Sequence, residues 1–198
     1  MKKLFTKLFI LAASAAALTS CNSKNDYDNS DYEKEIARID STNKAQAPKL
    51  KDYAAANFEN PKLDTASGIW FDVISEPADD TYSYVSGSGS LTSPAVKAKY
   101  VGKLMNGTTF DSSTDGSDFT ITAGQGGLIA AWKFAFYPKS IKYNGQTYPV
   151  GGITANGLKK GSKIQFIAPS TLCYDNRSND KIPANSPLFF EIEVMTIQ

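Results

Sequence analysis

The clearest alternation of polar and apolar residues in the chain lies in residues 96–104. Every second position there is apolar or small, and three of the four intervening positions are lysines. This period of two predicts a β-strand with one buried face. Asn106-Gly107 follows it and predicts a two-residue hairpin, because both residues tolerate positive φ. A second short strand around Phe119 comes next, and the apolar run 126–137 then predicts a short helix.

Further strands are predicted on both sides of this stretch. Aromatic and β-branched residues favour strands over residues 68–74, 163–168 and 188–195, and Asn144-Gly145 predicts a second hairpin over 141–150. Alternation in the last strand separates two sets of side chains: Phe190, Ile192 and Val194 on one face, and Phe189, Glu191 and Glu193 on the other. Many strands with one short helix in the main body predict an α+β domain, an antiparallel sheet wrapped on that helix.

The part of the chain before residue 66 is expected to lie outside this domain. Residues 21–47 are mostly polar and poor in aromatics, which predicts a flexible tether, with a short helix over 32–39 as the alternative. Residues 48–58 predict a helix with Pro48 at its first position, within a helical lead-in over 48–65. The domain itself is expected over residues 66–198.

The first twenty residues carry the features of an export signal. Three lysines precede the apolar run 8–18, which is too short to span a bilayer. Leu18-Thr19-Ser20-Cys21 then resembles the lipobox of bacterial lipoproteins, in which Cys21 is acylated after cleavage. The alternative is an ordinary secretory signal with a chance cysteine. We therefore expect a protein anchored through lipid on Cys21 in the bacterial cell envelope, periplasmic or surface-exposed.

Composition excludes several kinds of chemistry. The chain has no histidine, so Ser-His pairs, Cys-His pairs and histidine-based zinc sites are absent. Removal of the first twenty residues takes the net charge only from +1 to −2, which argues against nucleic acid as a partner. Cys173 is the one cysteine besides Cys21, so no intramolecular disulfide is expected once Cys21 is lipidated. No cofactor is expected, and the acidic residues of 111–118 lack the closing glutamate of a helix-flanked calcium loop.

The ordered motifs from residue 68 onward resemble the FKBP-type peptidyl-prolyl cis-trans isomerases. The matching pieces occur in the family's order: Tyr100-Val101-Gly102-Lys103-Leu104, Asn106 to Ser113 with Phe110-Asp111-Ser112-Ser113, Phe119, Gly124, Leu128 to Trp132, Gly157 to Gly161, Pro169 to Tyr174, Ile182-Pro183 to Leu188, and Phe190. The resemblance implies a half-open antiparallel sheet curled around a short helix, with an apolar pocket between them.

The resemblance also implies which residues form that pocket. The expected set comprises a floor, aromatic and aliphatic walls, a rim carboxylate and a polar hydroxyl: Trp132; Tyr100, Phe110, Phe119 and Phe190; Leu128, Ile129 and Ile182; Asp111; and Tyr174. The Tyr174 hydroxyl and the Ile129 N–H would bind carbonyls of a proline-containing segment of a client protein. The pocket would also bind macrolide inhibitors.

Four departures from the family pattern bear on activity. Asp175 stands where glycine is usual, Lys181 is expected to place a cation at the rim, and Ala131 replaces the glycine before the tryptophan. Residues 137–156 form an insertion that is predicted to fold as its own hairpin. The leading hypothesis is an isomerase that assists the folding of secreted or envelope proteins. The alternatives are a catalytically weak or inactive peptide-binding chaperone, and a surface protein that uses the inserted hairpin.

Overall fold

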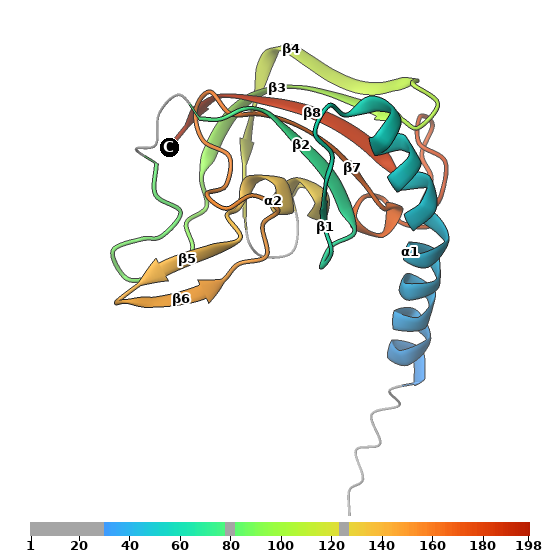
Figure 1. Cartoon of the computed structure of the whole chain (residues 1–198), viewed down its shortest axis with the longest axis horizontal. Coiled ribbons are helices and arrows are strands. Elements are labelled where there is room, and N and C mark those ends of the chain that lie inside the picture. Colours follow the sequence, from blue (N-terminus) through green and yellow to red (C-terminus); the bar gives the residue numbers. More distant parts are fainter. Residues whose placement is uncertain (1–29, 78–81, 123–126) are drawn as a thin grey trace, which may run out of the picture.

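The computed structural model describes residues 30–77, 82–122 and 127–198, and a six-stranded antiparallel sheet forms its centre (Figure 1). The strands lie in the order β1-β2-β7-β8-β3-β4, and β5 pairs with β6 in a separate ribbon. The strand bounds are β1 Lys62–Asp64, β2 Ile69–Ser75, β3 Ala95–Leu104, β4 Thr109–Thr120, β5 Ser140–Tyr143, β6 Gln146–Pro149, β7 Lys163–Ala168 and β8 Leu188–Ile197. The helices are α1 Ser30–Asn57 and α2 Ala130–Phe136, with a 3-10 turn at Ser170–Leu172. The predicted α+β class, with the sheet wrapped on one short helix, is confirmed.

The sheet separates two hydrophobic cores, because successive side chains of a strand point to opposite faces. Phe166 and Phe190 lie in the main core with α2, with their ring centroids 5.4 Å apart. Their neighbours Ile167 and Phe189 lie in a second core on the other face, against α1. Figure 1 shows α2 and α1 on these two sides of the sheet. The alternation predicted for the last strand is therefore correct.

Helix α1 corrects the predicted amino-terminal organisation. It runs without a break from Ser30 to Asn57, so the prediction of a flexible tether is wrong for residues 30–47, and Pro48 lies inside the helix. Leu50 and Ala54 of its second half are buried in the second core. The first half is polar and exposes most of its side chains. A few of its polar side chains make tertiary contacts with the rest of the domain. Composition does not reveal such contacts, and for this reason it predicts a tether where the structure has a helix.

The two Asn-Gly pairs form different turns. Asn144 and Gly145 both have positive φ, 49° and 76°, and form the predicted two-residue turn between β5 and β6. Gly107 has φ 88° and donates its N–H to the carbonyl of Leu104, whereas Asn106 is not in the left-handed region. The first hairpin thus has a longer turn closed by a glycine bulge, and the predicted two-residue turn is wrong there.

The export features fall outside the described residues. The apolar run 8–18 and Cys21 both precede residue 30, as does the first part of the tether. Among the residues from 30 onward that the structure describes, no helix is long and apolar enough to cross a membrane.

Candidate active site

A cavity of about 180 Å³ lies between α2 and the strands β3, β4 and β8. Nine of the ten site residues predicted from the sequence line it: Tyr100, Phe110, Asp111, Phe119, Leu128, Ile129, Trp132, Tyr174 and Phe190. Gly127, which the sequence did not single out, completes the lining. A larger hollow of about 690 Å³ lies between α1 and the β1–β2 segment, but none of the predicted residues lines it. The cavity on α2 is therefore the candidate site.

Trp132 forms the floor of this cavity. It lies in the first turn of α2 and is only 4% exposed. The rings of Phe119, Tyr100 and Phe190 surround it edge-on, at centroid distances of 5.0, 5.2 and 5.8 Å. Edge-to-face packing of this kind adds to the free energy of burial and restricts ring orientation. The floor is thus an apolar surface of fixed shape.

Gly102 permits the rings of Phe110 and Phe190 to pack against each other in the wall. It pairs with Phe190 of β8 on one side and Asp111 of β4 on the other. A Cβ at this position would lie 2.6 Å from Cζ of Phe110 and 3.1 Å from Cε1 of Phe190. Phe110 and Phe190 occupy that space and meet edge-to-face at 5.7 Å. The small residue in the strand pattern therefore has a packing role in the site.

The polar groups of the site lie at its edge. The Tyr100 hydroxyl donates to Oδ2 of Asp111 at 2.8 Å, and the N–H of Ser112 donates to Oδ1 at 2.9 Å. Asp111 is otherwise exposed. The two donors hold a carboxylate in one orientation at the rim, and both come from the β3–β4 hairpin.

Both tyrosine hydroxyls of the cavity are neutral at physiological pH. Burial and the hydrogen bond to Asp111 raise the pKa of Tyr100 to about 12. The pKa of Tyr174 is also raised, mainly by burial and to a smaller extent by the neighbouring Cys173 and Asp111. Tyr174 lines the cavity and is 37% exposed, so it lies at the cavity's edge. It is available as a hydrogen-bond donor to a bound carbonyl.

Ile182, next to Lys181, departs from its expected place. Ile182 is 3% exposed and packs in the main core, and it is not among the residues that line the cavity. Oδ1 of Asn179 accepts the N–H groups of both residues, which holds Ile182 inward. Lys181 is exposed and is not among the residues that line the cavity, and its place at the rim stays a prediction.

The other departures are accommodated by the fold. Asp175 has φ 56°, the left-handed conformation that glycine adopts most easily, and its side chain contacts α1. Ala131 is fully buried within α2. The insertion forms the β5–β6 ribbon, and Figure 1 shows it projecting from the domain below α2.

Within the described ranges, no group of three or more metal-ligating side chains is close enough to hold a metal ion. Asp111, Asp115 and Asp118 lie along strand β4. Burial raises the pKa of the Cys173 thiol, which therefore remains a protonated, weakly nucleophilic group. The site as described offers shape, apolar surface and hydrogen bonds.

Comparison with known proteins decides the family. The family model described as FKBP-type peptidyl-prolyl cis-trans isomerase matches residues 91–195, more than half of the chain. The chain belongs to this family. The matched range contains every cavity residue, from Tyr100 to Phe190. The catalytic roles of the individual residues remain predictions.

Several FKBP-family relatives are much longer than this chain. FK506-binding protein 4 of Chaetomium thermophilum is 30% identical over 103 residues, which are 52% of this chain and 17% of the relative. FK506-binding protein 4 of Gibberella zeae is 28% identical over 142 residues, which are 71% of this chain and 25% of the relative. The chain thus spans a quarter or less of these two relatives.

Solved structures show the same fold. A peptidyl-prolyl cis-trans isomerase from Pseudomonas syringae pv. tomato aligns with a TM-score of 0.51 at 21% identity, covering 78% of this chain and 95% of that one. FkpA from Escherichia coli aligns with a TM-score of 0.51 at 20% identity, covering 89% of this chain and 74% of that one. At such identities the likeness establishes the FKBP fold.

Proposed function

We propose that this chain is a peptidyl-prolyl cis-trans isomerase that acts through the cavity on α2. The observation that carries the proposal is the convergence of Tyr100, Phe119 and Phe190 around the buried Trp132. A proline ring is small and apolar, and a cavity of about 180 Å³ with an indole floor suits it. Membership of the FKBP family supports the same reaction.

The reaction requires no bond to be made or broken. Amide resonance sets a barrier of ~20 kcal/mol to rotation about the X–Pro bond. Twisting localises the nitrogen lone pair and reduces the charge separation of the amide. An apolar, water-poor cavity therefore disfavours the planar amide relative to the twisted one. Shortening a step of tens of seconds to milliseconds needs about 10⁴-fold, or about 5.4 kcal/mol.

The polar rim supplies orientation. The neutral hydroxyl of Tyr174 donates to a carbonyl of the bound segment, and the N–H of Ile129, at the start of α2, donates to a second one. The Asp111 carboxylate, held by Tyr100 and Ser112, presents a fixed negative charge toward the rotating amide. Groups fixed in this way stabilise a transition state without reorganisation.

The place of action follows from the amino terminus. Lipid attachment at Cys21 is supported by the three lysines, the short apolar run and the Leu-Thr-Ser-Cys sequence that ends it. The clients are then proline-containing segments of secreted or envelope proteins, met outside the cytoplasm. The same cavity binds macrolides, as the names of the FK506-binding relatives suggest.

A refolding assay tests the folding role. The protein from Asn22 onward is added to an unfolded client whose slow phase is limited by proline isomerisation. We expect that phase to accelerate in proportion to protein concentration and FK506 to suppress the effect. An unchanged slow phase, with the client's aggregation reduced, would instead favour a chaperone without catalysis.

Fractionation tests the anchor separately. The wild-type chain expressed in a bacterial host is expected in the membrane fraction, and Cys21→Ser in the soluble fraction of the envelope. Cys173→Ser is the matched control and is expected to remain with the membrane. Equal distribution of wild type and Cys21→Ser would contradict lipidation.

A further inference from the structure

We propose that helix α1 is part of the peptide-binding machinery, because Arg38 and Gln46 hold the segment that carries Tyr174. Both are positioning residues that act through Tyr174. The inference rests on the proposed function, since it assigns α1 a role in binding the X–Pro segment. It extends the site beyond the cavity, to a helix outside the matched range of the family model.

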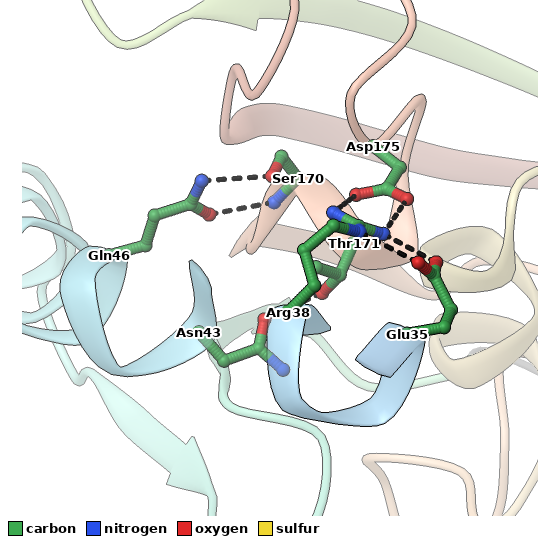
Figure 2. A network of polar contacts seen from close by, with 7 residues as sticks. All are labelled: Glu35, Arg38, Asn43, Gln46, Ser170, Thr171 and Asp175. Atoms are coloured by element: carbon green, nitrogen blue, oxygen red, sulfur yellow. Dashed lines mark hydrogen bonds and ion pairs between the residues drawn. The ribbon is translucent and has the colours of Figure 1, made fainter. Parts of the chain in front are cut away.

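The first contact is a bidentate ion pair between Arg38 and Asp175. Nη1 and Nη2 of Arg38 lie 3.0 and 2.5 Å from the two carboxylate oxygens of Asp175, 137 positions away in the chain (Figure 2). Glu35, one turn earlier on α1, accepts two further hydrogen bonds from Arg38 and orients it. The side chains of Arg38 and Asp175 are only 29% and 21% exposed. Partial burial and paired geometry make this contact stronger than an isolated surface ion pair.

The second contact is buried. Nε2 of Gln46 donates to Oγ of Ser170 at 2.8 Å, and Oε1 accepts the N–H of Ser170 at 2.9 Å (Figure 2). The same Nε2 donates to the carbonyl of Asn185 at 3.1 Å. Gln46 and Ser170 are 7% and 0% exposed, so water cannot replace these bonds at little cost.

The residues that α1 contacts, Ser170, Asp175 and Asn185, are also joined to one another by backbone hydrogen bonds. The N–H of Asp175 donates to the carbonyl of Ser170 at 2.7 Å, and the N–H of Asn185 donates to the carbonyl of Asp175 at 2.7 Å. Arg38 therefore binds Asp175, the central residue of this hydrogen-bonded set, and Gln46 binds Ser170 and Asn185. Oδ1 of Asn43 adds a third contact by accepting from Oγ1 of Thr171 at 2.6 Å.

Tyr174 immediately precedes Asp175, the central residue of this hydrogen-bonded set. The adjoining backbone at Asp175 is in the left-handed conformation, with φ 56°, and the contacts with α1 hold it in place beside Tyr174. Aspartate in that conformation is disfavoured relative to glycine, and the pair with Arg38 compensates for it. The usual glycine of the family is thus replaced by an aspartate with a partner on α1.

The test uses three variants of the chain from Asn22 onward. Arg38→Gln and Asp175→Asn each remove one charge of the ion pair. Asparagine tolerates positive φ as well as aspartate does, so any loss of affinity reports the missing contact with α1 rather than a new backbone preference at position 175. Lys34→Gln is the control, because it removes a positive charge four positions before Arg38 in a pair with Asp31 that does not involve the loop. Peptide affinity is read from Trp132 fluorescence, and kcat and KM from catalysed exchange.

We expect Arg38→Gln and Asp175→Asn each to raise Kd and KM about three- to tenfold, as loss of one charge-assisted contact predicts, with kcat unchanged. The double variant should be no weaker than either single one. In a Tyr174→Phe background, Arg38→Gln should have no further effect. Unchanged affinity in both variants, or an equal loss in the Tyr174→Phe background, would overturn the inference.

A second readout separates this inference from the proposed function. If the wild type binds no X–Pro peptide, the proposed function fails, and the affinity measurement cannot decide whether α1 positions the loop. Amide hydrogen exchange of residues 173–177 then decides. Faster exchange in Arg38→Gln but not in Lys34→Gln supports a positioning role for α1, and equal exchange in wild type and both variants overturns it.

Discussion

The Tyr100 hydroxyl and Oδ2 of Asp111 lie 2.8 Å apart and join two neighbouring strands at the mouth of the cavity. The tyrosine ring packs edge-on against Trp132, so one residue links the cavity floor to the rim carboxylate. The hydroxyl orients the carboxylate, and the hydrogen bond in turn helps to keep the hydroxyl protonated. Removing the hydroxyl therefore tests the rim while leaving the floor in place.

Tyr100→Phe should lower kcat/KM about three- to tenfold, the effect of losing one typical hydrogen bond at a solvent-exposed rim. The unfolding free energy should change by less than about 1 kcal/mol, because Asp111 is open to water. Tyr148→Phe is the control, since among the residues that the structure describes the Tyr148 hydroxyl bonds only Gln146, on the exposed ribbon. Equal kcat/KM in wild type and Tyr100→Phe would show that the carboxylate's orientation is irrelevant to turnover.

The pH dependence follows from the same pair. Tyr100 has its pKa raised from 10 to about 12 in the folded protein, so in this interval the unfolded chain has lost the proton that the folded chain retains. The stability contributed by the neutral hydroxyl is therefore complete below pH 10 and is lost as the pH rises toward 12. Activity should be flat between pH 6 and 9, measured by catalysed exchange in buffers of constant ionic strength. In an absorbance titration of the tyrosines, the wild type should show one ionisation with a pKa near 12, and Tyr100→Phe should lack it.

The floor residue can be separated from ordinary core. Trp132→Leu and Ile69→Ala both remove buried volume and should each lower the unfolding free energy by about 2–4 kcal/mol. Ile69 lies on β2 and does not line the cavity. Only Trp132→Leu should then lower kcat/KM, by tenfold or more, at a temperature where both variants are folded. If Ile69→Ala lost activity to the same extent, Trp132 would be merely structural.

Gly102 offers a steric test of the wall. Gly102→Ala places a Cβ 2.6 Å from Phe110, so the ring must move, at about 1–3 kcal/mol of stability. The cavity changes shape with the ring, and peptide affinity should fall. Gly87→Ala is the matched control, because a Cβ there meets nothing within 4 Å. Thermal denaturation and peptide titration of both variants check the prediction, and equal stability of the two would contradict the packing role.

The sequence predicted most of the sheet and most of the cavity lining. Alternation in β3 and β8 is a local signal, and Phe189 and Phe190 lie on the opposite faces it indicates. Ile182 was misplaced because a motif fixes the order of residues but not the direction of a side chain. In this case Asn179 turns the segment so that Ile182 faces the core.

Helix α1 is predicted only in part, as a helix over 48–58 with 32–39 as an alternative, for a different reason. Its first half has only the short apolar set Tyr32, Ile36 and Ile39, and proline at position 48 predicts a helix start rather than a helix interior. The polar contacts that hold it against the loop of residues 170–185 join residues more than 120 positions apart, such as Gln46 with Ser170. Such contacts leave no pattern in the local sequence. Asp175 is visible in the sequence as a departure from the family pattern, but only the structure reveals its partner Arg38.

We propose above that the aromatic cavity accelerates rotation about an X–Pro bond. Its most direct measurement is the cis–trans exchange rate of a short X–Pro peptide by NMR, with the chain from Asn22 onward at catalytic concentration. We expect exchange well above the spontaneous rate for the wild type and for Ile69→Ala, and at least tenfold less enhancement for Trp132→Leu. Exchange at the spontaneous rate with folded wild-type protein, whether or not the peptide binds, would contradict the claim.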